Sequence, residues 1–281
     1  MILKEFKGYF SNRLSNIYPK TEIDTFFFLL IEEYLNFKRI DSVLKPDFDI
    51  SEDIMILLEN ALTKLIKEEP IQYIIGKTEF FGLPFLVNKN TLIPRPETEE
   101  LVEWILNEID KTNSQKILDI GTGTGCIPIS LAKKLSNVEV FAIDVSENAL
   151  KIAKQNAALN NTKINFIETD ILNTNTLPQS FNIIVSNPPY VRELEKVEIK
   201  NNVLENEPHL ALFVEDNNPL IFYNKIANLA KHQLTKNGLL FFEINQYLGD
   251  ETVLLLKQKG FSKIELRKDL FGNNRMIKAS L

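Results

Sequence analysis

Five short apolar runs alternate with helical stretches in the C-terminal two thirds of the chain. The runs span 116–120, 138–143, 164–167, 181–186 and 239–244, and the segments between them carry apolar residues at helical spacing. Strands that alternate with helices in this way form a parallel sheet with helices on both faces. The sequence therefore predicts an α/β fold with a doubly wound, Rossmann-like sheet.

The ends of the chain follow other patterns. From residue 1 to about 69, apolar residues recur at helical spacing, as in Leu3, Phe6, Phe10 and Leu14, which predicts a small N-terminal helical bundle. Between 78 and 87, aromatic and β-branched residues around a Gly-Leu-Pro turn predict a hairpin. Two strand-like runs after residue 261 are expected to add antiparallel strands at the sheet edge. We expect three parts: a bundle over 1–76, a hairpin linker over 77–92 and the sheet domain over 93–281.

Composition excludes several classes of function. The 38 acidic and 32 basic residues give a net charge of −6, which argues against a general nucleic-acid coat. A single cysteine, Cys126, excludes an internal disulfide and a cysteine-based zinc site, and two histidines do not favour a histidine-rich one, so no metal site is expected. The chain begins without the apolar core of a signal peptide, and its longest apolar run, 26–31, is too short to span a bilayer. We expect a cytoplasmic protein with no membrane association.

A glycine-rich turn follows the first strand-like run and leads directly into a helical segment. In a doubly wound sheet, this turn lies at the carboxyl end of a strand, where ligands bind, and glycines let the backbone approach a ligand closely. Cys126 stands where a dinucleotide-binding pattern has its third glycine, and no lysine follows to make a phosphate-binding loop. The candidate cofactor-binding residues of this turn are Gly121, Thr122, Gly123, Thr124 and Gly125.

Acidic residues follow the next two strand-like runs. Asp144 ends the second run, where a carboxylate can accept hydrogen bonds from both hydroxyls of a ribose. Asp170 follows the third run, where it could accept a hydrogen bond from an adenine amino group, with Ile171 offering its backbone and an apolar contact. Either aspartate alone could instead cap the helix or turn that follows it. Together with the glycine-rich turn, they predict a nucleoside-containing cofactor.

The most specific feature is an Asn-Pro-Pro-Tyr turn after the fourth run: Asn187, Pro188, Pro189 and Tyr190. Two consecutive prolines fix φ and remove two backbone donors, so the turn is rigid and rich in acceptors. The Asn187 side chain adds another acceptor oxygen and Tyr190 a flat apolar face. Such a turn suits a planar substrate group that carries an NH₂, and amide or amino nitrogens are poor nucleophiles that need orientation. A proline turn that simply ends a strand is the alternative.

These residues resemble the amino-methyltransferases, which include both N6-adenine DNA methyltransferases and protein glutamine methyltransferases. Further segments resemble the peptide chain release factor glutamine methyltransferases, the PrmC or HemK family, and the resemblance covers nearly the whole chain from residue 70 onward. These segments are 72–76 (QYIIG), 79–82 (EFFG), 92–99 (LIPRPETE) and, after the Asn-Pro-Pro-Tyr turn, Glu207-Pro208 with 211–213 (ALF).

The resemblance implies a seven-stranded methyltransferase sheet and S-adenosylmethionine as cofactor. It implies that the chain methylates the glutamine of the Gly-Gly-Gln tip of class 1 release factors on its side-chain nitrogen, with 121–125 and Asp144 holding the cofactor and 187–190 the glutamine. The bundle would dock the release factor, and direct contact with nucleic acid is not expected. An N6-adenine DNA methyltransferase is the alternative enzyme, and a cofactor-binding scaffold the alternative outside enzymes.

Two segments depart from the family pattern. Glu243-Ile244-Asn245 replaces a Glu-x-Gly, and Asn273-Asn274-Arg275 is a loose version of an Asp-x-x-Arg. We expect both to lie away from the chemistry. Arg95 could belong to the rim of the active site or serve as an ion-pair partner, and His209 falls in the loop near the substrate without an assigned role.

Overall fold

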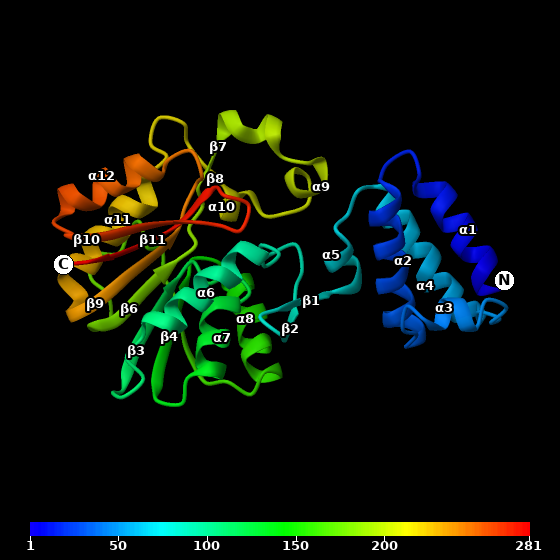
Figure 1. Cartoon of the computed structure of the whole chain (residues 1–281), viewed down its shortest axis with the longest axis horizontal. Coiled ribbons are helices and arrows are strands. Elements are labelled where there is room, and N and C mark those ends of the chain that lie inside the picture. The colour runs from blue at the N-terminus through cyan, green and yellow to red at the C-terminus, as the bar shows by residue number, and fades with distance from the viewer. The chain divides into compact units, whose positions relative to one another are not determined.

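The computed structural model describes all 281 residues, and they form two compact units (Figure 1). Unit 1 comprises Met1–Gly76 together with Asn201–Asn206. Unit 2 comprises Lys77–Lys200 and Glu207–Leu281. None of the helices combines the length and the apolar character that crossing a membrane requires.

Unit 1 is a helical bundle, as the spacing of apolar residues predicts. On the first helix, Leu3, Phe6, Phe10 and Leu14 are all buried, because residues three or four apart share one face of a helix. They pack against the buried face of the second helix, which includes Phe27. The helices of this unit are α1 (Leu3–Leu14), α2 (Lys20–Leu35), α3 (Asp41–Leu44), α4 (Glu52–Ile66), α5 (Ile71–Ile75) and, from the distant segment, α9 (Asn201–Leu204).

Unit 2 contains a seven-stranded sheet in the order β10-β11-β9-β6-β3-β4-β5. The five strands from β9 to β5 run parallel, and β11 is antiparallel to both of its neighbours. The strands are β3 (Gln115–Ile120), β4 (Val138–Asp144), β5 (Ile164–Glu168), β6 (Phe181–Ser186), β9 (Leu234–Glu243), β10 (Lys263–Lys268) and β11 (Asn274–Ser280).

Helices cover both faces of this sheet (Figure 1). Successive strand residues point to opposite faces, so Leu118 packs in the core beneath α11 and α12, while Ile117 packs in the core beneath α6, α7 and α8. The doubly wound α/β fold is therefore confirmed. These helices are α6 (Pro96–Glu108), α7 (Cys126–Lys134), α8 (Glu147–Leu159), α11 (Ile221–Gln233) and α12 (Gly249–Lys259).

The five predicted central strands are all present, and β9 differs most from its predicted range. It begins at Leu234 rather than at 239, because Leu234 pairs with Phe181 before a register shift between Phe181 and Ile183 of β6. The polar stretch between these two points carries no strand-like apolar pattern. At the C-terminus, the two strands are antiparallel to each other as expected, but only β11 is antiparallel to the central strands, and β10 forms the edge.

The predicted hairpin consists of β1 (Lys77–Phe80) and β2 (Leu83–Leu86), and the structure places it in unit 2. Phe80 and Phe85 are buried in the core beneath α6, α7 and α8. Shorter elements follow β6: the two-stranded pair β7 (Val191–Arg192) and β8 (Phe213–Val214), the 3₁₀ helix η1 (Glu193–Glu198) and α10 (His209–Leu212).

Candidate functional site

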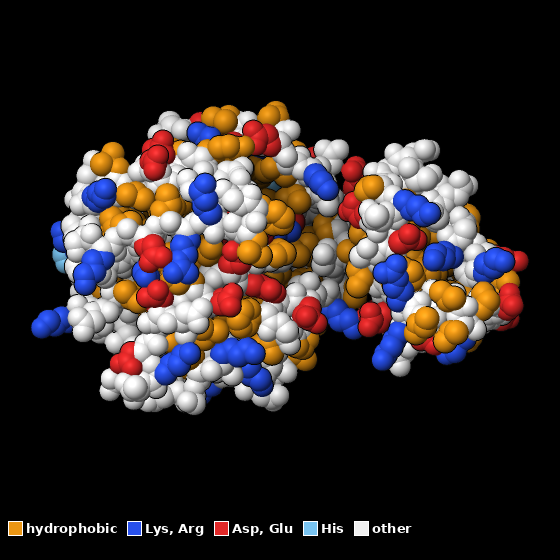
Figure 2. Space-filling model, viewed as in Figure 1, with side chains coloured by type: hydrophobic (Ala, Val, Ile, Leu, Met, Phe, Trp, Pro, Cys, Tyr) orange, Lys and Arg blue, Asp and Glu red, His pale blue; other side chains and the backbone are white.

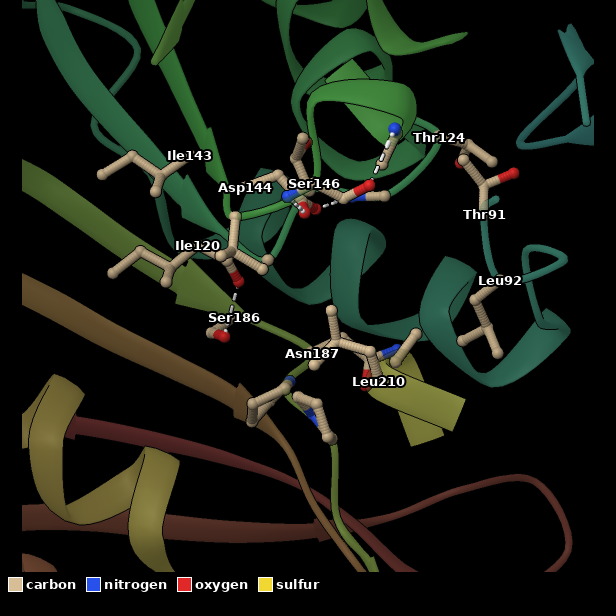
Figure 3. A pocket seen from close by; sticks show the side chains of 18 of the residues that line it. Thr91, Leu92, Ile120, Thr124, Ile143, Asp144, Ser146, Ser186, Asn187 and Leu210 are labelled. Atoms are coloured by element: carbon tan, nitrogen blue, oxygen red, sulfur yellow. Dashed lines mark hydrogen bonds between the residues drawn. The ribbon is translucent and has the colours of Figure 1, made fainter. Parts of the chain in front are cut away.

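A pocket lies at the carboxyl ends of the parallel strands β3, β4 and β6 in unit 2 (Figure 3). It encloses about 1140 Å³, counting the space open to solvent. The chain leaves β3 toward β4 on one side and returns to β6 on the other, so the pocket occupies the point where the strand order reverses. Ligands of doubly wound sheets bind at such a point.

The glycine-rich turn forms one wall of the pocket. Gly121, Gly123 and Gly125 all have positive φ, and α7 begins immediately afterwards at Cys126. A Cβ on Gly121 would lie 4.0 Å from the carbonyl oxygen of Asn187, so this turn and the Asn-Pro-Pro-Tyr turn are close neighbours. Gly121, Thr122, Gly123 and Thr124 line the pocket, whereas Gly125 lies beneath it, against Ile129 of α7.

Asp144 lines the pocket at the end of β4, beside the glycine-rich turn. Its Oδ2 accepts a hydrogen bond from the amide of Gly123 over 2.8 Å, and its Oδ1 accepts one from the amide of Ser146 over 2.9 Å. Burial raises the pKa of Asp144 above its ordinary value. The carboxylate therefore both supports the turn before the next helix and faces the pocket.

Asp170 and Ile171 line the pocket after β5. The carboxylate of Asp170 accepts hydrogen bonds from the amide of Leu172 over 2.9 Å and from the side-chain amide of Asn173 over 2.6 Å. Asp170 therefore stabilises its local turn, as the alternative interpretation holds, and it stands at the pocket as well. Ile171 is buried and offers an apolar wall.

The Asn-Pro-Pro-Tyr turn forms the adjoining wall. The hydroxyl of Ser186 donates to the carbonyl oxygen of Ile120 over 2.7 Å, which ties the end of β6 to the end of β3. Asn187, Pro188 and Pro189 line the pocket, and the Asn187 side-chain NH₂ donates to Thr98 Oγ1 over 3.3 Å. Figure 3 shows Asn187 beside Leu210, with Asp144 and Ser146 at the end of β4, two strands away from β6.

Tyr190 is not brought to the pocket lining. Its ring packs against the core beneath α11 and α12, and its hydroxyl donates to Glu243 Oε1 over 3.0 Å. Burial and the Glu243 carboxylate both raise its pKa. A flat face of Tyr190 presented to the pocket, as the sequence predicts, is therefore not what the structure shows.

The two segments that depart from the family pattern were expected to lie away from the chemistry. None of their residues lines the pocket, although Glu243 contacts Thr98, which does. Glu243 ends β9, and its carboxylate accepts hydrogen bonds from Tyr190 and from Thr98. The side-chain amide of Asn245 donates to the carbonyl oxygen of Tyr190 over 2.9 Å. Arg275, on the adjacent β11, forms an ion pair with Asp269. The strand order places β9 next to β6 and β11 next to β9, and residue spacing alone does not reveal that order.

Arg95 fits both interpretations that its sequence leaves open. It lines the pocket, and its guanidinium pairs with Glu207 Oε1 over 2.6 Å. Glu207 is almost fully buried and also accepts a hydrogen bond from the amide of Ile93. This pair joins the segment before α6 to the segment before α10, which begins at His209; the His209 ring packs edge-on against Phe213. The role of Glu207 was missed, although it stands in one of the quoted family segments.

Cys126 lines the pocket as the first residue of α7. Burial raises the pKa of its thiol to about 12, which keeps the sulfur protonated and unreactive. It therefore acts as a small wall residue rather than as a nucleophile.

Two family models match the chain: the PrmC N-terminal domain over residues 9–76 and the Methyltransferase small domain over residues 98–212. The release factor glutamine methyltransferase of Flavobacterium psychrophilum is 56% identical over an alignment that covers 100% of this chain and 99% of the relative. The chain belongs to the release factor glutamine methyltransferase family. The predicted resemblance is thereby confirmed.

Other members and related folds agree with this assignment. The release factor glutamine methyltransferase of Bacteroides thetaiotaomicron is 40% identical, over 99% of this chain and 100% of the relative. The catalytic domain of hMettl16 superimposes with a TM-score of 0.57 at 19% identity, over 71% of this chain and 76% of that domain. A methyltransferase from Pyrococcus furiosus gives a TM-score of 0.51 at 18% identity, over 79% of this chain and 98% of that chain. These two likenesses concern the fold alone, and they confirm a Rossmann-like methyltransferase sheet in this family member.

Proposed function

We propose that this release factor glutamine methyltransferase transfers a methyl group from S-adenosylmethionine to the side-chain amide nitrogen of a glutamine in a class 1 release factor. The observation that carries the proposal is that the glycine-rich turn and the Asn187-Pro188-Pro189 turn face one pocket. A methyl donor and an amide acceptor can thus meet there. The family resemblance implies a more specific substrate, the glutamine of a Gly-Gly-Gln tip.

The residues that line the pocket suit S-adenosylmethionine. Gly121 and Gly123 have positive φ and let the backbone of the turn approach a ligand closely, and α7 begins at the pocket with Cys126, so the positive end of its helix dipole lies there. Asp144 supplies a carboxylate for ribose hydroxyls, and Ile171 with Ile143 supplies apolar walls for a flat ring. When bound, this group supplies an electrophilic methyl carbon on a positively charged sulfur.

The chain's own residues bind and orient the nucleophile. We assign the Asn187 side-chain oxygen and the Pro188 carbonyl oxygen as acceptors for the two N–H bonds of the glutamine amide. The amide lone pair is delocalised, so holding the nitrogen in line with the methyl carbon contributes much of the rate. Because the nitrogen gains positive charge as the new bond forms, these hydrogen bonds strengthen in the transition state, and that difference is what lowers the barrier.

Two observations weigh against an N6-adenine DNA methyltransferase. Family membership favours a protein substrate. On the face shown in Figure 2, basic and acidic side chains are interspersed rather than gathered in one basic stripe. Binding to DNA phosphates relies on clustered Lys and Arg. We assign release factor docking to the bundle of unit 1, which matches the PrmC N-terminal domain model.

Mass spectrometry of a release factor incubated with the enzyme and S-adenosylmethionine tests the proposal. We expect one added methyl group, located on the glutamine of the Gly-Gly-Gln tip. A release factor with that glutamine changed to glutamate is the matched substrate control, and duplex DNA offered in the same reaction tests the alternative. Methyl label in the DNA with none in the release factor would overturn the proposal.

The Asn187→Ala variant tests the site. It should bind the cofactor as the wild type does and lose methyl transfer by roughly 100-fold or more, as when one group that stabilises a transition state is removed. Wild-type turnover in this variant would contradict the assignment of the Asn187 oxygen.

A further inference from the structure

A chain of buried hydrogen bonds runs from the end of β9 to the pocket wall. Thr98, in the first turn of α6, is 2% exposed, and Glu243 is 1% exposed. The Thr98 hydroxyl donates to Glu243 Oε2 over 2.7 Å, and Thr98 Oγ1 accepts from the side-chain NH₂ of Asn187 over 3.3 Å. Of these three residues, Thr98 and Asn187 line the pocket, whereas Glu243 lies behind Thr98 and does not line it.

Burial raises the pKa of Glu243, while the hydrogen bond donated by Thr98, the positive charge of Arg275 and the hydrogen bond donated by Tyr190 act to lower it. With this carboxylate ionised, the direction of the hydrogen bonds follows. An ionised carboxylate can only accept, so the hydroxyls of Thr98 and Tyr190 must both donate to Glu243. Once its single proton is used, Thr98 can only accept from Asn187. The side-chain amide of Asn187 can satisfy that acceptor only with its NH₂, which leaves its oxygen for a ligand in the pocket.

We propose that Glu243 is a positioning residue, whose carboxylate acts through Thr98 to fix the side-chain amide of Asn187 with its oxygen toward the substrate nitrogen. This inference rests on the proposed function, which gives that oxygen the task of accepting an N–H bond. With the amide turned over, an NH₂ would face an NH₂, and the glutamine nitrogen would lose one of its two acceptors. Because Asn and Gln amides differ little in shape between their two orientations, only the neighbouring partner decides between them.

Thr98→Val is the decisive variant, because valine keeps the shape of threonine and removes the hydroxyl. We expect kcat for release factor methylation to fall roughly 10- to 100-fold, the scale of a misplaced catalytic group. The KM for the release factor and the Kd for S-adenosylhomocysteine should each stay within about threefold, because valine keeps the shape of the pocket wall. Thr98→Ser keeps the hydroxyl and should restore kcat to within about threefold of the wild type.

Glu243→Leu removes the acceptor at the far end of the chain of hydrogen bonds. Its kcat should fall at least as far as that of Thr98→Val, and the double variant should be no slower than Glu243→Leu alone, since residues that act in series are not additive. Tyr223→Phe is the matched control. The Tyr223 hydroxyl donates to the backbone carbonyl of Glu243, so its loss disturbs the same residue without reaching the carboxylate, and kcat should not change.

The outcomes separate this inference from the proposed function. If the wild-type enzyme does not methylate the release factor, the proposed function is wrong. A wild-type enzyme that turns over, together with a Thr98→Val variant of equal kcat, overturns the positioning role. Equal losses in Thr98→Val and Thr98→Ser would also overturn it, because the hydroxyl would then not matter. Should Glu243→Leu fail to fold, the comparison of valine with serine at position 98 decides alone.

Discussion

The amide of Gly123 donates a hydrogen bond to the carboxylate of Asp144 over 2.8 Å, so the residue that ends β4 holds the turn that follows β3. The second oxygen of that carboxylate accepts from the amide of Ser146. Two neighbouring strand ends are thus joined at the pocket through one side chain. A ribose in this pocket would meet a carboxylate that the protein has already fixed in place.

We expect Asp144→Asn to weaken cofactor binding by roughly 10- to 100-fold, because a hydrogen bond to a charged group contributes about 1.5–3 kcal/mol. The variant loses the charge and one of the two acceptor oxygens. Isothermal titration of S-adenosylhomocysteine measures the effect. Asp110→Asn, at an exposed turn outside the pocket, serves as the control. Equal affinity in Asp144→Asn and the wild type would remove Asp144 from the cofactor site.

Local patterns predict much of this fold because each strand carries its own signal. A strand buried on both faces, such as β6, has a nearly continuous apolar sequence. The observed range of β6, Phe181–Ser186, matches the predicted one. The start of β9 carries no such signal, since Lys236, Asn237 and Gly238 are polar or small. The strand starts early because Leu234 pairs with Phe181 of β6, and pairing is a property of the whole sheet.

The pocket wall could be predicted only where its residues follow strand ends. Asp144 and Asn187 stand directly after predicted strands, so their meeting at one edge follows from parallel topology. Thr98 and Glu243 are 145 residues apart, and nothing in either segment indicates that their side chains touch. The same holds for Asn201–Asn206, which clusters with the bundle although it lies within the sheet domain's stretch of sequence.

We expect Gly125→Ala to destabilise the fold by about 2–4 kcal/mol, because strain and crowding add. Gly125 has φ +80°, and an added Cβ would lie 2.9 Å from Ile129 Cδ1 and 3.3 Å from Ala153 Cβ. Gly272→Ala is a matched control, since Gly272 has φ +86° and no atom within 4 Å of an added Cβ. Its loss should be only about 1–2 kcal/mol. Chemical denaturation measures both, and equal losses would show that crowding at Gly125 contributes nothing.

We expect Asn156→Ala to release the β1–β2 hairpin from α8. The fully buried side chain of Asn156 accepts from the amide of Leu86 over 2.6 Å and donates to the carbonyl oxygens of Leu86 and Thr124. Alanine leaves these backbone groups without partners, at a cost of about 2–4 kcal/mol. Hydrogen exchange at the Leu86 amide should accelerate, whereas Gln155→Ala, on the exposed side of the same helix, should leave it unchanged. Slow exchange in the Asn156 variant would contradict the anchoring role.

We expect Asp119→Asn to stabilise the protein increasingly as pH rises. Asp119 is buried beside the glycine-rich turn, and burial raises its pKa from 3.8 to about 7, although the Thr122 hydroxyl acts to lower it. The folded chain holds this proton more tightly than the unfolded chain, so the wild type loses stability as pH rises between those two pKa values. Asparagine does not titrate, so the variant has no such loss. The gain of the variant over the wild type should therefore grow by roughly 2–4 kcal/mol between about pH 4 and about pH 8. Urea denaturation without cofactor across this range measures it, and a gain that does not vary with pH would show that Asp119 does not lose its proton near neutrality.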